Sequence, residues 1–176
     1  MTDRSKFPVE YQDLLNMDKV LEKTPNKHEL KVTLQKDLVK GVGLYATKLI
    51  KKGEVIAYYR IKTFIWLKYK SPTNFVYGFE IYTKTGKESK KLIGDIDLTS
   101  IPDPENNIPY WGLFVNEPFK DQKLNAEIDL DLNNNYNATN KCVADRYLRY
   151  KLTAIRNIEP GQEITLNYGE DYPRSY

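Results

Sequence analysis

The chain has 176 residues, of which 40% are hydrophobic and 29% charged, so it is long enough for one globular domain and has the composition of a folded protein. Its mean hydropathy is −0.63, its apolar runs are only a few residues long and its first ten residues are largely polar, so we expect no transmembrane helix, no secretory signal and an intracellular protein. The net charge of +3 is too balanced to predict direct nucleic-acid binding, and one Cys with one His excludes a disulfide framework or a Cys/His metal cluster built within this chain.

Residues 7–23 are predicted to form an amphipathic helix. Pro8 suits a helix start, where its missing N–H needs no partner, and Thr24-Pro25-Asn26 ends the helix. The apolar residues that fall near one face are Tyr11, Leu14, Leu15 and Leu21. We therefore expect residues 1–28 to be an N-terminal helical extension docked on the main domain; a helix that binds a partner or a second copy of the chain is the alternative.

From Glu29 onward the sequence predicts short strands separated by turns. Alternating or β-rich runs predict strands at 30–34, 54–59, 75–82, 128–132 and 150–154. Clusters of Gly, Pro, Asn and Asp predict turns at 84–87, 102–107 and 133–137. Many short strands with few helices indicate a mainly β domain.

One pattern occurs twice. Ala46-x-Lys48-x-Ile50-x-x-Gly53-x-x-Ile56 has the same spacing as Ala154-x-Arg156-x-Ile158-x-x-Gly161-x-x-Ile164. Two copies are too few for a solenoid, so they predict two similar turn–strand units within one small β fold.

Three segments could carry chemistry, and each also has a purely structural interpretation. Gly41 and Gly43 allow close approach of the backbone to a ligand, or they form a simple hairpin turn. Asn116 follows the apolar run 111–115 and offers both a donor and an acceptor, for a ligand or for a turn. Tyr168 follows a predicted strand and precedes Gly169, so its phenol could face a cavity or lie in the core.

Taken in order, these segments resemble the motifs of SET-domain protein-lysine methyltransferases. The stretch GVGLYATKLIKKGEVI is similar to the first motif of that family, WGLFVNEP with LNA to the second, and YKLTAIRNIEPGQEITLNYGEDY to the last. The resemblance covers nearly everything after Glu29. It implies a mainly β SET-domain fold over residues 29–172, with small curved sheets, short helices and a knot-like C-terminal threading, followed by a short tail at 173–176.

The resemblance also implies a cofactor, S-adenosylmethionine, and a role for each matching residue. Tyr168 would be the catalytic tyrosine, and Asn116 would accept a hydrogen bond from the cofactor ammonium. The other residues implied to bind the cofactor are Gly41, Val42, Gly43 and Tyr45 at its methionine end, and Glu117 and Tyr172 near its adenine. The substrate would be a lysine-bearing protein, with a histone as the family-level expectation; no metal is implied, and a homodimer is left open.

Aromatic walls of the lysine channel could come from several tyrosines, which the sequence does not rank: Tyr58, Tyr59, Tyr110, Tyr136 and Tyr147. Glu127, Asp129 and Asp131 alternate with apolar residues, which predicts three carboxylates on one face of a strand. They could attract a basic peptide, or they could form an ordinary solvated face.

Two departures from the family motifs leave a second function open. Glu117-Pro118 stands where the family has His-Ser, and the segment from Asn116 to Asn125 is longer than usual. The alternative to an enzyme is therefore a catalytically inactive SET-like module that binds lysine-bearing peptides.

Overall fold

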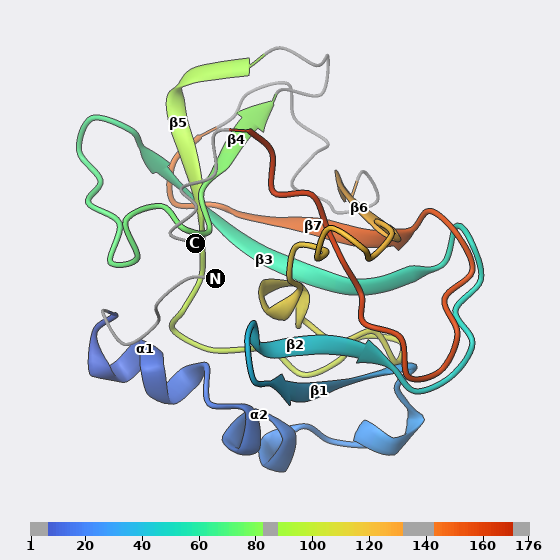
Figure 1. The fold of residues 1–176 in the computed structure, drawn as a ribbon. Coiled ribbons are helices and arrows are strands. Elements are labelled where there is room, and N and C mark those ends of the chain that lie inside the picture. Colours follow the sequence, from blue (N-terminus) through green and yellow to red (C-terminus); the bar gives the residue numbers. More distant parts are fainter. Residues whose placement is uncertain (1–6, 83–87, 132–142, 171–176) are drawn as a thin grey trace.

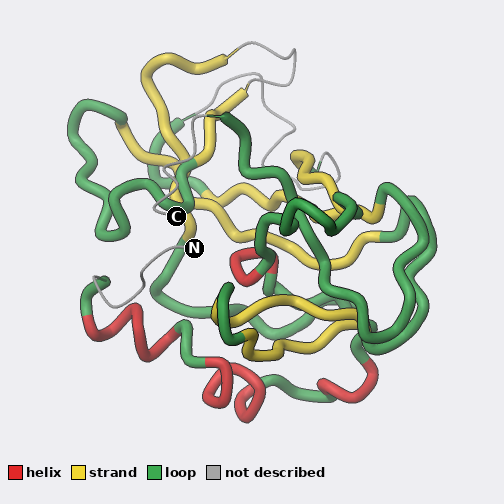
Figure 2. The backbone as a smooth tube through the Cα atoms, in the orientation of Figure 1, coloured by secondary structure: helices red, strands yellow, loops and turns green. Residues whose placement is uncertain are grey.

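The computed structural model describes residues 7–82, 88–131 and 143–170, and their architecture is mainly β (Figures 1 and 2). A two-stranded sheet pairs β1 (Val32–Asp37) with β2 (Gly41–Ala46). A five-stranded antiparallel sheet has the order β4 (Phe79–Tyr82), β5 (Glu88–Ile96), β3 (Val55–Ile65), β7 (Tyr147–Ala154) and β6 (Ala126–Leu130). No helix in the described ranges is long and apolar enough to cross a membrane.

The N-terminal extension contains two short helices where the sequence predicts one. These are α1 (Val9–Leu14) and α2 (Met17–Lys23), which run beside the β1–β2 sheet (Figure 1). The break falls at Leu15-Asn16 because Asn16 takes an extended conformation and caps α2, accepting a hydrogen bond from Lys19 N at 3.1 Å. Phe7, Leu15 and Val20 are buried in the same hydrophobic cluster as the strands, so the extension shares the core of the main domain.

Four of the five predicted strands are confirmed with shifted ends, as β1, β3, β6 and β7. The fifth, expected at 75–82, begins only at Phe79, because Asn74 and Phe75 adopt positive φ angles of 53° and 59° and form turns. The turn at 102–107 is confirmed: Asn106 and Asn107 occupy the left-handed region between Glu105 and Ile108, which form a bridge. Strand β5 was not predicted, and the turns expected at 84–87 and 133–137 lie outside the described residues.

The two copies of the repeated pattern pair with each other. Ile50 and Ile158 exchange backbone hydrogen bonds of 3.0 and 2.8 Å. Gly53 N donates to Ala154 O and Gly161 N donates to Ala46 O, both at 2.8 Å, so each turn glycine reaches the first residue of the other copy. Both glycines have φ near +87°, a conformation that side chains disfavour. This exchange brings the C-terminal segment that follows Gly161 alongside β2.

The segment 163–168 then passes between the two ends of the 116–126 loop. Leu166 N donates to Asn116 O at 2.9 Å, and Ala126 N donates to Thr165 O at 3.1 Å. Because one trans peptide group points its C=O and N–H in opposite directions, the two loop ends lie on opposite sides of the segment. The Asn125 side chain adds two buried bonds of 2.8 Å, to Glu163 O and from Thr165 N. The knot-like threading that the sequence resemblance implied is therefore present.

The acidic alternation near β6 does not form the predicted three-carboxylate face. Glu127 and Asp129 are exposed, and Asp129 lies opposite Lys151 on β7. Asp131 lies just beyond the end of β6 with its side chain 5% exposed, and its Oδ2 accepts a 2.7 Å hydrogen bond from Arg149 Nε. That arginine also pairs with Glu105, so Asp131 is committed to a structural ion-pair cluster and is not available to a peptide.

Replacing Asp131 should therefore cost stability, whereas replacing Asp129 should not. We expect Asp131→Asn to lower the free energy of unfolding by about 1.5–3 kcal/mol, because it removes a charge-assisted bond within a buried pair. Asp129→Asn, the matched control, should stay within about 0.5 kcal/mol of wild type. Urea denaturation at pH 7 measures both, and equal losses in the two variants would contradict the buried ion pair.

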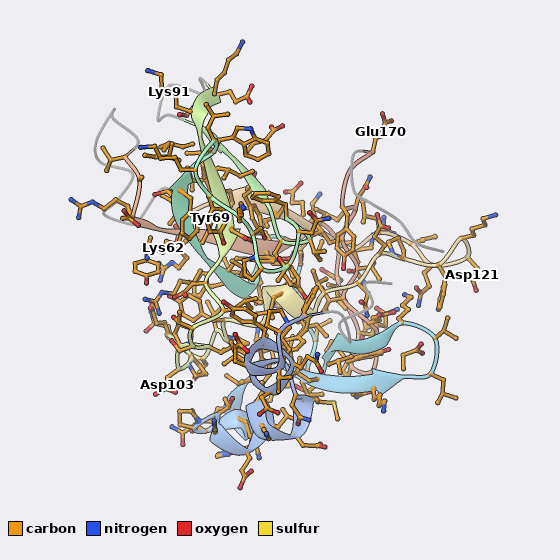
Figure 3. The ribbon with its side chains drawn as sticks, turned by 90° about the vertical axis from the view of Figure 1, so that its left-hand side faces the viewer. Lys62, Tyr69, Lys91, Asp103, Asp121 and Glu170 are labelled. Carbon is orange, nitrogen blue, oxygen red and sulfur yellow. The ribbon has the colours of Figure 1, made fainter. Side chains whose placement is uncertain are left out.

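The loop between β3 and β4 is held by one buried carboxylate. Asp95 is 1% exposed and accepts hydrogen bonds from Tyr69 Oη at 2.9 Å and Ser71 Oγ at 2.7 Å. Tyr69 also stacks on Phe64 with ring centroids 3.7 Å apart (Figure 3 labels Tyr69). Burial raises the pKa of Asp95, an effect that the hydrogen bonds from Ser71 and Tyr69 only partly offset.

This raised pKa has a definite consequence for stability. The folded state binds the proton of Asp95 more tightly than the unfolded state, so the contribution of Asp95 is most favourable at low pH and declines as pH rises from about 4, the usual carboxyl value, through the raised value. Asp95→Asn should flatten that decline in urea denaturation between pH 4 and 7, and the exposed Asp103→Asn should keep the wild-type slope. A slope in Asp95→Asn identical to wild type would contradict the assignment.

Candidate functional site

A cleft of about 1350 Å³ lies beside the threaded segment. Most of its walls come from five parts of the chain that are far apart in sequence: the α1–α2 junction, the β1–β2 turn, the 76–80 segment, the 112–119 segment and the end of the threaded segment at 166–168. Single residues of β3, β6 and β7, namely Tyr59, Ile128 and Tyr150, complete them. The threading brings the 112–119 and 166–168 segments together, because Leu166 is hydrogen-bonded to Asn116. The N-terminal extension therefore contributes to the same cleft as the segments singled out from the sequence.

Five of the predicted site residues line this cleft: Gly41, Val42, Asn116, Glu117 and Tyr168. Gly43 lies behind its wall, and Tyr45 and the three acidic residues Glu127, Asp129 and Asp131 are not among its lining residues. Burial, with the charge of Glu163, raises the pKa of the Tyr45 phenol. Tyr172 lies outside the described residues.

Gly41 begins β2 directly after a tight turn. Its φ is +78°, which favours glycine, and Asp37 Oδ1 accepts hydrogen bonds of 2.7 Å from both Val39 N and Lys40 N. These two backbone N–H groups lower the pKa of the Asp37 carboxyl. The turn thus fixes where the backbone of Gly41 and Val42 meets the cleft.

Asn116 is the polar side chain at the junction of the cleft and the core. Its Nδ2 donates to Glu163 Oε1 at 3.1 Å and lies 3.4 Å from Val42 O. Gly43 makes this approach possible, because a Cβ there would lie 2.9 Å from Asn116 Nδ2 and 3.0 Å from Glu163 Oε1. Gly43, the second glycine of the first motif, therefore serves close packing behind the cleft. Its φ is not positive, so the reason for glycine here is space and not backbone conformation.

Tyr168 stands at the end of the threaded segment, where the chain turns sharply. Gly169, which follows, has φ +89°. The Tyr168 hydroxyl donates to Val115 O, and its backbone N donates to Glu117 Oε1 at 3.2 Å. The glutamate that replaces the histidine of the family motif thus holds the backbone of the tyrosine. Since the hydroxyl hydrogen is bonded to Val115 O, the phenol oxygen has lone pairs with which to accept from a ligand.

The aromatic wall differs from the sequence prediction. Tyr59 is buried and its pKa is raised well above the usual value, mainly by burial and also by the neighbouring Tyr168 and Tyr77. Sequence reasoning missed four other aromatic residues that line the cleft: Tyr77, Phe79, Phe119 and Tyr150. Phe79 packs against Tyr59 and Tyr150 with ring centroids 5.6 and 4.9 Å apart. Tyr150 reaches the cleft because it lies opposite Tyr59 in the pairing of β3 with β7. That pairing depends on strand register, which cannot be predicted from the local sequence.

Five tyrosines are aromatic-wall candidates from the sequence, and of the four that the structure describes Tyr59 alone lines the cleft. Tyr58 and Tyr110 pack on each other beside Arg149, and Tyr147 lies against Arg60, all away from the cleft lining. Tyr136 lies outside the described residues.

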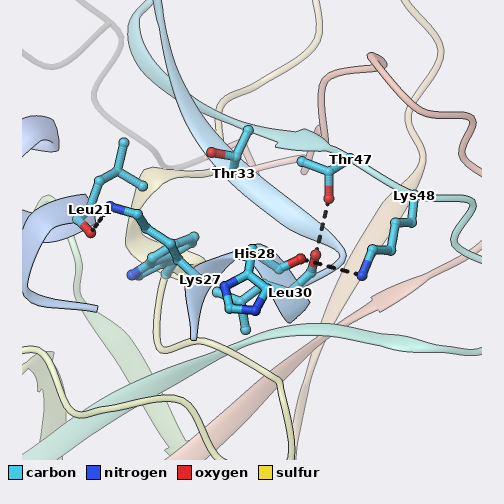
Figure 4. Close-up of a pocket in the computed structure, with 8 residues that line it drawn as sticks. Leu21, Lys27, His28, Leu30, Thr33, Thr47 and Lys48 are labelled. Carbon is cyan, nitrogen blue, oxygen red and sulfur yellow. Dashed lines mark hydrogen bonds between the residues drawn. The ribbon is translucent and has the colours of Figure 1, made fainter. Parts of the chain in front are cut away.

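A second, smaller hollow of about 330 Å³ lies between α2 and the 47–48 turn (Figure 4), and Trp111 also lines it. Its cations bond to backbone carbonyls: Lys27 Nζ to Leu21 O at 2.9 Å and Lys48 Nζ to Glu29 O at 3.2 Å. Thr47 Oγ1 donates to Leu30 O at 3.1 Å. The Thr47 and Lys48 bonds join the chain just after the extension to the segment that follows β2, so we assign this hollow a structural role.

Known proteins resemble this chain in sequence pattern and in fold. Residues 41–169 match the SET-domain family. A candidate histone methyltransferase from Plasmodium falciparum has a similar structure, with 17% identity, a TM-score of 0.52, and 81% of this chain and 96% of that chain covered. A comparison with curated proteins found no match.

Two further solved structures are similar at lower TM-scores. The methyltransferase domain of human PR domain-containing protein 2 has 23% identity and a TM-score of 0.47, with 89% and 86% of the two chains covered. KRYPTONITE, in a complex with mCHH DNA, H3(1–15) peptide and SAH, has 18% identity and a TM-score of 0.47 over 84% of this chain and 26% of the other. The match over residues 41–169 covers most of the chain, and the threading and the cleft follow the arrangement that its motifs implied: the chain belongs to the SET-domain family.

Proposed function

We propose that this protein is a protein-lysine methyltransferase that uses S-adenosylmethionine. The observation that carries the proposal is that Gly41, Asn116 and Tyr168, from the three separate motifs, line one cleft. Membership of the SET-domain family supports the same reaction class. Lysine as the acceptor is part of the proposal.

The described residues fit the methionine end of this cofactor. Asn116 uses its Nδ2 towards Glu163 and Val42, and no described residue donates to its Oδ1. A carbonyl oxygen accepts from an ammonium group, so Asn116 Oδ1 suits the cofactor ammonium. Gly41 and Val42 offer backbone groups without a bulky side chain at the first position. Contact of Glu117 or Tyr172 with adenine, and of Tyr45 with the methionine end, stays a prediction.

When bound, S-adenosylmethionine supplies a methyl group on a positively charged sulfur. The protein must present a neutral lysine amine to it. The aromatic wall of Tyr59, Phe79 and Tyr150 would shield a bound amine from water, and because desolvation lowers the pKa of an amine, the ammonium form would be disfavoured there. The described cleft lining contains no histidine, which agrees with deprotonation through environment, without a dedicated strong base.

Tyr168 would orient the amine. Its hydroxyl donates to Val115 O, and a phenol oxygen can also accept an N–H, so it could accept from the amine and direct the nitrogen lone pair across the cleft. Alignment of this kind supplies a large part of the rate of a group transfer. The pre-formed bond to Val115 holds the phenol in place before a substrate arrives.

A basic peptide, with a histone as the leading example, is the proposed substrate. Glu127 and Asp129 are the two exposed carboxylates of β6 that could attract it, whereas Asp131 is excluded by its ion pair. An intracellular location belongs to this proposal and does not distinguish nucleus from cytoplasm. A homodimer and the absence of direct nucleic-acid binding stay predictions.

An inactive peptide-binding module is the alternative, favoured by Glu117-Pro118 in place of His-Ser. Against it, Glu117 accepts from Tyr168 N, so the replacement supports the position of the tyrosine. The two functions differ in one measurable respect, the transfer of a methyl group.

Methyl transfer from labelled S-adenosylmethionine to core histones, and to a cell lysate, tests the proposal. We expect wild type to label a lysine substrate and Tyr168→Phe to lose about 100-fold or more of the rate, because the orienting hydroxyl is gone. Cofactor affinity, measured by calorimetry, should change less than about twofold in that variant, since the Asn116 and Gly41 contacts remain.

Tyr147→Phe is the matched control, because Tyr147 lies against Arg60 and does not line the cleft. It should keep wild-type labelling. Wild type that neither binds the cofactor nor labels either pool would favour the peptide-binding module, and equal activity in Tyr168→Phe would remove the tyrosine from the mechanism.

A further inference from the structure

The most heavily bonded buried charge near the cleft is Glu163, which the motif comparison left without a role. Its side chain is 5% exposed and lies in the threaded segment directly behind Asn116. One oxygen, Oε1, accepts from Asn116 Nδ2 at 3.1 Å. The other, Oε2, accepts from Lys40 Nζ at 2.6 Å and Gln122 Nε2 at 3.3 Å. Burying a carboxylate destabilises the folded state unless such partners compensate its charge, so the fold requires these hydrogen bonds at this position.

We infer that Glu163 is a positioning residue that sets which end of the Asn116 amide faces the cleft. The inference rests on the proposed function, in which Asn116 Oδ1 receives the cofactor ammonium. An amide can rotate to exchange its oxygen and nitrogen, and the two orientations have nearly the same shape. An ionised carboxylate only accepts hydrogen bonds, so Glu163 admits only the orientation with Nδ2 towards itself. Oδ1 is left for the cofactor.

Lys40 makes this arrangement stable and extends it to a second segment. Its side chain is 9% exposed, and its Nζ donates to Gln122 Oε1 at 2.7 Å as well as to Glu163. The same Nζ lies 4.1 Å from the centre of the Phe119 ring. Gln122 Oε1 also accepts from Phe119 N at 2.9 Å. Lys40 thus pairs with the buried carboxylate and, through Gln122, holds residues 117–124, the loop that is longer than the family motif.

This loop, which we call the 117–124 strap, runs outward from the cleft edge. Asp121, near its middle, projects away from the body of the molecule (Figure 3). The Lys40 and Gln122 bonds, together with the bond from Tyr168 N to Glu117 Oε1, hold the strap where Glu117 and Phe119 meet the cleft. Glu163, the carboxylate that orients Asn116, therefore also connects the strap to the part of the cleft where the methionine end of the cofactor would bind.

A double-mutant cycle on cofactor binding tests the inference. Calorimetry gives the Kd of S-adenosylhomocysteine for wild type, Glu163→Gln, Asn116→Ala and the double variant. A glutamine no longer enforces one orientation of the amide, so we expect Glu163→Gln to weaken binding about 10-fold or more. In the Asn116→Ala background the same change should cost less than about twofold, because the group it acts through is absent. Kinetically, the KM for the cofactor should rise while kcat at saturating cofactor stays within a few-fold.

Two further variants serve as the control and as the alternative should Glu163→Gln not fold. Glu159→Gln, an exposed glutamate in the adjoining turn, should bind as wild type. If Glu163→Gln does not fold because Lys40 is left unpaired, Lys40→Met with Glu163→Gln removes the ion pair as a unit and carries the same expectation.

Each outcome is distinct. Unchanged affinity in Glu163→Gln, or an equal loss with and without Asn116, would overturn the positioning role. Failure of wild type itself to bind S-adenosylhomocysteine would instead overturn the proposed function, and the inference with it.

Discussion

The passage of residues 163–168 between the two ends of the 116–126 loop is the constraint on which the site depends. Asn116 lies on one side of this segment and Ala126 on the other, and both are bonded to the single peptide group between Thr165 and Leu166. The buried Asn125 amide fixes the segment further. If the segment were displaced, Tyr168, Glu163 and Asn116 would lose their mutual positions together, because none of them is held by its own strand alone.

Two arrangements place the segment there. The two copies of the Ala–Ile–Gly pattern are hydrogen-bonded to each other through Ile50 and Ile158. This pairing places the chain after Gly161 beside β2, where Ile164 N donates to Leu44 O at 2.7 Å. Gly43 then lets Asn116 and Glu163 pack closely behind the cleft. The repeated sequence pattern, the glycine at position 43 and the buried Glu163 carboxylate thus each help to form the cleft. All three lie within the segments that match the SET-domain motifs.

The sequence predicted those parts of the site that depend on local pattern. The three motifs, the mainly β class, the repeat and the 102–107 turn are all visible in residue type and spacing. Other features depend on contacts between distant segments. The spacing of Asp131 fits an exposed strand face, but the residue lies just past the end of β6 and forms an ion pair with Arg149. Strand register brings Tyr150 to the cleft, and only the folded chain shows that Lys40 and Glu163 meet, 123 positions apart.

The most direct test of this account is hydrogen–deuterium exchange with and without S-adenosylhomocysteine. The account predicts that the ligand slows exchange in three separate segments at once, 41–42, 116–118 and 166–168, because they line one cleft, and leaves β5, which does not line it, unchanged. No change in these segments, or protection confined to only one of them, would contradict the claim that the threaded segment builds a cofactor site.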